Sequence, residues 1–257
     1  MLIGAGAALA VAVSTFFLKK KKKATPKKIS VKYFGMPATP GEKLRLALCL
    51  TVGKDNFTDD RVVFGTWKDM KPTVKYQQLP VLYLDDVEYH QSGAALRYIG
   101  GNLGDGSMYP LDDAEMLLKI EEMIGVLDDL QRSWMPALYI SMRPASMGYA
   151  GISDEDKTAK AKEMREAFLA NDLPKYMGFL TAALEAGGNQ FLCGETLTIA
   201  DCQCLPQLHY FTRGVADFVP ADCLDKYTVV VEYLTRVKAV PAIKEWNDAQ
   251  TAAAAKK

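Results

Sequence analysis

The sequence predicts an α/β domain followed by an all-α domain, the two preceded by a single transmembrane helix. An uncharged run from Leu2 to Leu18 is followed at once by lysines. From Ile29 onward, short apolar runs alternate with turn-forming residues, as they do in a sheet domain. Beyond Pro110 the apolar residues recur at three- and four-residue steps, which is the period of amphipathic helices.

Residues 1–28 are expected to be a membrane anchor with a polybasic linker. The run over residues 2–18 is long enough, as a helix, to approach the thickness of the hydrocarbon core. Lys19 to Lys23 follow the run, whereas a cleavable signal peptide carries its positive charge before it. The positive-inside rule then places the rest of the chain in the cytosol, at an organelle outer membrane or the endoplasmic reticulum. A cleaved targeting sequence is the alternative.

Residues 29–103 are expected to form the α/β domain. Alternation and β-branched residues predict strands over 30–34, 57–64, 79–84 and 87–89, with helices over 42–52 and 91–99. The order βαβ followed by ββα is typical of a thioredoxin-like domain, in which helices cover both faces of one sheet. Residues 104–112, rich in Gly, Asp and Pro, are the expected linker.

Residues 113–250 are expected to form the all-α domain. Apolar positions at helical spacing predict helices over 114–134, 154–186, 198–210 and 229–246. Pro174 lies inside the second of these ranges and predicts a kink there.

Composition excludes two other classes of protein. A formal net charge of zero argues against nucleic-acid binding, which needs a basic face. The chain has five cysteines, an odd number scattered through apolar segments, so it is no disulfide framework and suits a reducing compartment. With only two histidines and no zinc-ligand spacing, no metal site is expected.

Several polar and aromatic residues of the α/β domain have a specific spacing. Leu79-Pro80 is followed eleven residues later by Gln91-Ser92. The residues that complete the pattern are Tyr33, at the end of the first strand, and Trp67, Lys71 and Gln78, which precede Pro80. In this combination the chain resembles the glutathione transferases, most closely the sigma class that includes glutathione-dependent prostaglandin D synthases. The resemblance covers roughly residues 29–247 and implies glutathione as co-substrate.

The resemblance implies how glutathione is held. A cis Pro80 would turn the backbone of Leu79 outward to pair with the cysteinyl part of glutathione. Gln91 and Ser92 open a helix, whose exposed N–H groups and positive dipole end favour the γ-glutamyl carboxylate. A second group of residues is implied for the rest of the ligand: Lys71 and the Trp67 indole for the glycyl carboxylate, and Gln78 for the ligand backbone.

Tyr33 matches the catalytic tyrosine of the family. A phenol that donates to sulfur stabilises the thiolate alone, and such a hydrogen bond contributes roughly 1.5–3 kcal/mol. That is enough to ionise a thiol of pKa about 8.5 near neutral pH. The following turn, residues 35–42, departs from the family because it is one residue longer and has no arginine. Glu42 and Arg45 keep the family's Glu-x-x-Arg step.

The resemblance extends into the all-α domain. Asp129, in the pair Asp128-Asp129, matches a carboxylate that crosses to the glutathione of a partner subunit, which implies a homodimer. Thr198 and Asp201 match a helix N-terminal capping box. A pocket for the hydrophobic electrophile is expected between the domains, lined by Met36, Trp134, Met135, Tyr139 and Met142, because methionine and aromatic walls suit varied apolar substrates.

The expected function is that of a glutathione transferase, which activates the glutathione thiol as a thiolate for attack on hydrophobic electrophiles. Two alternatives stay open. One is a non-catalytic glutathione-transferase-like binding or assembly module at a membrane, which the missing arginine favours. The other is a glutathione-dependent isomerase of prostaglandin-type lipids, which the sigma resemblance favours.

Overall fold

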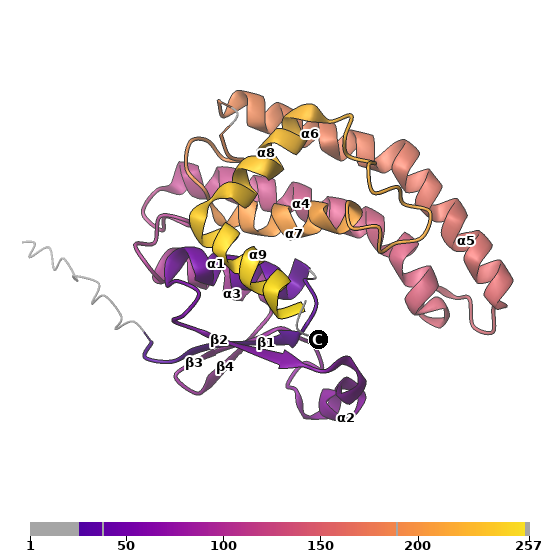
Figure 1. The fold of residues 1–257 in the computed structure, drawn as a ribbon, viewed down its shortest axis with the longest axis horizontal. Coiled ribbons are helices and arrows are strands. Elements are labelled where there is room, and N and C mark those ends of the chain that lie inside the picture. The colour runs from indigo at the N-terminus through magenta and orange to yellow at the C-terminus, as the bar shows by residue number, and fades with distance from the viewer. Residues whose placement is uncertain (1–25, 38, 189, 255–257) are drawn as a thin grey trace, which may run out of the picture.

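The computed structural model describes residues 26–37, 39–188 and 190–254. A sheet domain and a larger helical domain pack directly on each other, with the sheet domain below in the view of Figure 1. The predicted anchor, residues 2–18, lies outside the described residues. Within those residues, no helix has both the length and the apolar character needed to cross a membrane.

The sheet has the strand order β2-β1-β3-β4. Strand β1 runs parallel to β2 and antiparallel to β3, and β3 runs antiparallel to β4. The strands span Ile29–Phe34 (β1), Thr58–Val62 (β2), Val81–Leu84 (β3) and Val87–His90 (β4). This order and polarity confirm the predicted thioredoxin-like domain.

Helices cover both sides of the sheet (Figure 1). Helices α1 (Thr39–Thr51) and α3 (Ser92–Asn102) pack together on the side that faces the helical domain. The short α2 (Trp67–Met70) lies on the other side, between the 3₁₀ turns η1 (Phe64–Thr66) and η2 (Lys71–Thr73). Residues 41–49 of α1 are all buried, because α7 and α9 cover the surface that the sheet leaves free.

The helical domain begins at α4 after a segment without helix or strand. Its helices are α4 (Ala114–Met142), α5 (Asp154–Ala167), α6 (Leu173–Ala186), α7 (Ile199–Phe211), α8 (Thr228–Ala239) and α9 (Pro241–Ala254). The prediction ended α4 at Trp134, but the helix continues through Pro136 to Met142.

Proline explains where the other predicted helices divide. The helix predicted over 154–186 is interrupted by a π-helical segment, Phe168–Asp172, just before Pro174. Pro174 has no N–H to donate to the preceding turn, so the regular helix restarts there. The helix predicted over 229–246 ends at Ala239 and resumes at Pro241, where the missing N–H costs nothing at the first position of a helix.

The predicted capping box at the start of α7 is confirmed. The side chain of Asp201 is fully buried and accepts from the backbone N–H of Thr198 at 2.7 Å and of Leu192 at 3.1 Å. It also accepts from the hydroxyl of Tyr233 in α8 at 2.9 Å. Burial raises the pKa of Asp201, and these hydrogen bonds oppose that rise. The box therefore joins α7 to α8 and to the loop that precedes α7.

Polar side chains connect the two domains inside an otherwise apolar contact. The buried Lys43 of α1 donates from Nζ to Oε1 of Gln203 in α7 at 2.9 Å. Gln203 in turn donates from Nε2 to Oδ1 of Asp128 in α4 at 2.8 Å. Burial lowers the pKa of Lys43 to about 8, and the Asp128 carboxylate opposes that shift. In α9, Trp246 donates from Nε1 to Oε1 of Glu42 at 2.7 Å.

Candidate active site

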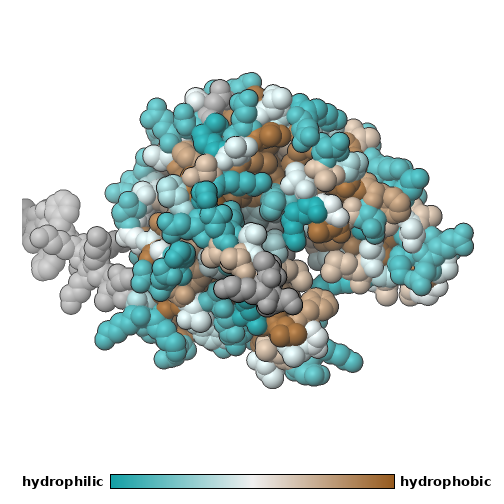
Figure 2. Space-filling view, viewed as in Figure 1, coloured by the Kyte–Doolittle hydropathy of each residue, from teal (hydrophilic) through white to brown (hydrophobic). Residues whose placement is uncertain are grey.

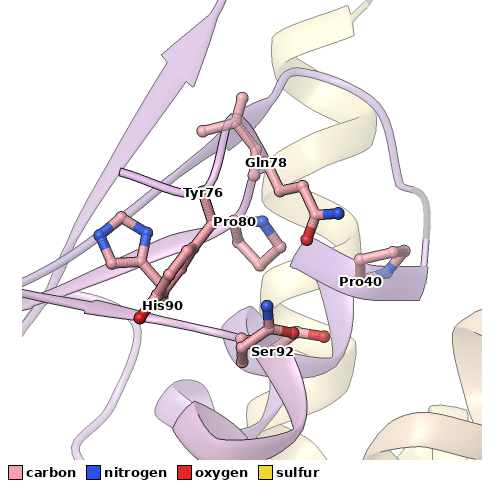
Figure 3. Close-up of a pocket in the computed structure, with 8 residues that line it drawn as sticks. Pro40, Tyr76, Gln78, Pro80, His90 and Ser92 are labelled. Atoms are coloured by element: carbon pink, nitrogen blue, oxygen red, sulfur yellow. The ribbon is translucent and has the colours of Figure 1, made fainter. Parts of the chain in front are cut away.

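A pocket of about 200 Å³ lies where α1, the loop before β3 and the start of α3 meet (Figure 3). It brings together the predicted residues Gln78, Leu79, Pro80, Gln91 and Ser92. Pro40, Tyr76 and His90 complete the lining. In Figure 3 the side chain of Gln78 lies to the right of the Pro80 ring and that of Ser92 lies below it.

The backbone explains why this pocket suits a peptide with an anionic end. The Leu79–Pro80 peptide bond is cis, as predicted, and it leads directly into β3. Gln91 has φ of 71°, a left-handed turn that ends β4 and starts α3 at Ser92. The first N–H groups of a helix have no partner within it, and the dipole there favours an anion. The pocket thus combines an exposed strand start with an anion-binding helix end.

Trp67 and Lys71 are not part of this lining. Trp67 begins α2, where it is half-buried and its ring meets that of Phe34 edge-on at 5.7 Å. Lys71 is exposed in η2, the next turn along the chain. Their predicted contact with the glycyl carboxylate remains a prediction.

Tyr33 lies beside the pocket and does not line it. It is 6% exposed and shares the inner face of β1 with Ile29 and Val31. Its ring lies so close to Gly41 that a Cβ there would come within 2.1 Å of Cδ1. Gly41 follows Pro40, which does line the pocket, so the tyrosine ring packs against the residue next to the lining. Burial raises the pKa of Tyr33 to about 12, so its hydroxyl is a donor at neutral pH.

Arg45 supplies a positive charge close to the turn that has no arginine of its own. Its guanidinium lies over the Tyr33 ring, 5.7 Å from the centroid. It donates from Nη2 to the carbonyl of Phe34 at 2.9 Å and from Nη1 to that of Met36 at 3.3 Å. It is 1% exposed and forms ion pairs with Glu42 and Asp59.

The Glu42/Arg45 step was visible in the sequence, but this role of Arg45 was not. The sequence signal for it was a pair of charged residues, Glu42 and Arg45, on an otherwise apolar helix, because buried charges need partners. Arg45 also opposes the rise in the pKa of Tyr33.

Three of the residues predicted to line the electrophile pocket share one face of a helix, and the pocket itself remains a prediction. Met135, Tyr139 and Met142 are three or four residues apart on α4 and so share one face of that helix. Met36 and Met142 are exposed, at 41% and 56%. Figure 2 shows a hollow between the region of α2 and the end of the helical domain at the right of the view. The surface on the helical side of this hollow is hydrophobic.

Trp134 corrects that prediction. It is 3% exposed, and its ring packs against Phe168 at 5.0 Å and Phe211 at 5.2 Å. One residue along a helix turns the side chain by about 100°, so Trp134 faces the interior while Met135 lies at its edge. The ring stabilises the helical core and has no open surface toward the hollow.

Asp129 is exposed on α4 and forms an ion pair with Arg132 of the same helix. Its neighbour Asp128 is held by Gln203. The role of Asp129 toward a partner subunit remains a prediction.

The pocket also includes Tyr76 and His90, which the sequence analysis did not propose. Their rings meet edge-on, with centroids 5.2 Å apart. His90 directly precedes the Gln91-Ser92 pair, and this adjacency was the available signal.

Comparison with known proteins agrees with the two-domain fold. A family model described as "Glutathione S-transferase, C-terminal domain" matches residues 146–250. Glutathione S-transferase 1 of Ascaris suum is 27% identical over 190 residues, 74% of this chain and 82% of that protein. Hematopoietic prostaglandin D synthase of Gallus gallus is 25% identical over 193 residues, 74% of this chain and 81% of that protein.

A solved structure shares the whole two-domain architecture. The prostaglandin synthase D of Nilaparvata lugens superposes with a TM-score of 0.70 at 25% identity, over 86% of this chain and 97% of that one. By these comparisons the chain is similar to glutathione S-transferases, and prostaglandin D synthases are among the proteins that it resembles.

Proposed function

We propose that the protein is a glutathione transferase that binds glutathione in the pocket of Figure 3 and attacks hydrophobic electrophiles with its thiolate. The curated relatives support a transferase, and their family uses glutathione as co-substrate. The observation that carries the proposal is the meeting of Gln78, Leu79 and Ser92 in one cavity. Gln78 and Leu79 come from the loop before β3 and Ser92 from the start of α3, and each offers the kind of group that a γ-glutamyl peptide needs.

In the proposed mechanism, Leu79 presents its backbone to the cysteinyl part of glutathione, and Ser92 with the start of α3 holds the γ-glutamyl carboxylate. Trp67 and Lys71 hold the glycyl carboxylate. The thiol is then held toward Pro40 and Gly41, beside Tyr33. The Tyr33 hydroxyl donates to the sulfur and stabilises the thiolate, while Arg45 adds a positive charge behind the ring. The electrophile enters from the hollow, against Met36 and the exposed face of α4.

Two other functions have an observation in their favour. Tyr33 is buried and does not line the pocket, and the turn after it has no arginine. Both observations favour a non-catalytic glutathione-binding module. Relatives named prostaglandin D synthases favour a glutathione-dependent lipid isomerase. Conjugation of glutathione to a generic aryl halide distinguishes the transferase from a non-catalytic binding module. Isomerisation of a prostaglandin endoperoxide distinguishes a lipid isomerase from the transferase. A chain that binds glutathione and conjugates nothing overturns the proposed activity.

Binding itself has a direct test. Residues 29–257 should be retained on immobilised glutathione and eluted by free glutathione. Ser92→Ala should weaken that retention, because the γ-glutamyl carboxylate then loses one charge-assisted hydrogen bond, an effect of about tenfold in affinity. Ser107→Ala, a change in the exposed linker, serves as the matched control. Retention that resists both free glutathione and Ser92→Ala would contradict the assignment of this pocket.

We also propose that the protein acts as a homodimer in which Asp129 reaches the partner's glutathione.

We propose further that residues 2–18 anchor the protein in an organelle outer membrane or the endoplasmic reticulum membrane, with the folded part in the cytosol. Deleting residues 1–23 should move the protein from the membrane pellet to the soluble fraction with unchanged thermal unfolding. The apolar run has no charged residue, so its transfer into lipid supplies the attachment. A truncated protein that still pellets with membranes after a salt wash would contradict the anchor.

A further inference from the structure

His90 is the last residue of β4 and lines the pocket next to Gln91 and Ser92. Its side chain is 5% exposed. Within the described part of the chain, neither ring nitrogen of His90 has a hydrogen-bond partner. The Tyr76 ring packs roughly perpendicular to the imidazole, with the two ring centroids 5.2 Å apart. In Figure 3 the tyrosine ring lies between the imidazole and Pro80. Buried polar atoms are nearly always hydrogen-bonded in folded proteins, so these two nitrogens need an explanation.

The nearest charged group does not satisfy the imidazole by itself. Nε2 of His90 lies 3.4 Å from Oε2 of Glu88, an ion-pair distance without hydrogen-bond alignment. The other oxygen of Glu88 accepts from the hydroxyl of Tyr83 at 3.1 Å, and Lys32 lies over the Tyr83 ring. Glu88 thus faces Nε2, whereas Nδ1 has no partner among the described residues and is covered, with the Tyr76 ring packed against the imidazole.

The composition of the pocket indicates what that partner is. Of the described residues that line it, His90 is the one with a basic side chain. The start of α3, beside it, favours an anion, but it offers only partial charge. Among these lining residues, the imidazole of His90 is therefore the side chain that can donate to a carboxylate as a cation.

We propose that His90 is a further glutathione-binding residue, whose protonated ring donates from Nδ1 to the γ-glutamyl carboxylate while Glu88 pairs with Nε2. The inference rests on the proposed function, since it requires glutathione in this pocket. Tyr76 covers the imidazole from the loop before β3, and Glu88 faces it from β4. The carboxylate is then held between the N–H groups of α3 and the imidazolium, in an arrangement with a balanced charge.

The test is calorimetric titration of residues 29–257 with glutathione between pH 5.5 and 8, where imidazoles titrate. Affinity of the unaltered protein should fall as pH rises. His90→Phe, which keeps a ring against Tyr76, should bind about ten- to thirtyfold more weakly at the acidic end and should show little pH dependence. His209→Gln alters the other histidine of the chain, in α7, and should leave the affinity and its pH dependence unchanged.

Fragments of glutathione locate the contact. γ-Glutamylcysteine should show the same loss in His90→Phe, because it has the γ-glutamyl carboxylate. Cysteinylglycine, which lacks that group, should bind both proteins equally. If His90→Phe does not fold, His90→Gln takes its place, and the imidazole NMR signals of His90 in the unaltered protein should move on addition of glutathione.

Equal affinity and equal pH dependence in the variant and the unaltered protein would overturn the role of His90, and so would an equal loss for all three peptides. Failure of the unaltered protein to bind glutathione at any pH would instead overturn the proposed function.

Discussion

Replacing Tyr33 with Phe should lower kcat/KM for aryl-halide conjugation about 10- to 100-fold at neutral pH, because one charge-assisted hydrogen bond of about 1.5–3 kcal/mol to the thiolate is lost. The ring remains, so its packing against Gly41 and the position of β1 should be preserved. Glutathione affinity should change far less, because the helix end and the backbone of Leu79 provide most of the contacts. The measurement is steady-state kinetics with a parallel binding titration.

The pH dependence tests how Tyr33 acts. The pKa of Tyr33 is raised to about 12, so the hydroxyl stays a donor over the whole range in which a thiol ionises. The deficit of the Phe variant should therefore shrink as pH rises past about 8.5, where the thiolate forms without assistance. A deficit independent of pH would mean that Tyr33 positions the ligand. No deficit in an active protein would move the thiolate's donor to the turn over residues 35–41.

Replacing Asp201 with Ala should lower the free energy of unfolding by about 3–5 kcal/mol, because two buried backbone N–H groups and a buried hydroxyl lose their acceptor. Thr198 and Leu192 provide those N–H groups and Tyr233 the hydroxyl. The loss of the cap at the start of α7 adds to the cost. Urea denaturation of residues 29–257, followed by circular dichroism, measures the change.

Two further variants make that result specific. Asp201→Asn keeps one acceptor oxygen and should destabilise the protein by less than Ala does. Asp222→Ala removes an exposed carboxylate in the loop before α8 and should alter stability by less than about 0.5 kcal/mol. A similar loss in Asp222→Ala and Asp201→Ala would contradict the assignment of the cost to the buried box.

The sheet domain was predictable because its signals are local. Alternation in β1, turn residues at each strand end and a proline before β3 each follow from a few neighbouring residues. The capping box was predictable for the same reason, since Thr198 and Asp201 are three residues apart. Helix ends were less accurate, because Pro136 is accommodated inside α4 whereas Pro241 begins a new helix.

The candidate site was predictable only where backbone fixes it. Leu79, Gln91 and Ser92 meet because strand and helix starts determine their positions. The direction of a side chain depends on tertiary packing, as Trp134 and Tyr33 show. Trp134 turns toward Phe168 and Phe211, and Tyr33 turns over the space that a glycine leaves. Phe168 and Phe211 are far from Trp134 in sequence, and Gly41 lies beyond the turn that follows Tyr33, so spacing alone did not predict these contacts.

The burial of α1 on all sides has a consequence for how the molecule melts and how it can be divided. Helix α1 belongs to the sheet domain by sequence, yet α7 and α9 cover its outer surface. Residues 29–103 produced alone would expose that apolar surface to water and should self-associate. The two halves should therefore unfold in one cooperative transition, with coincident near- and far-ultraviolet circular dichroism curves. In this chain the thioredoxin-like half is not an exchangeable module, because it shares one continuous core with the helices that cover it.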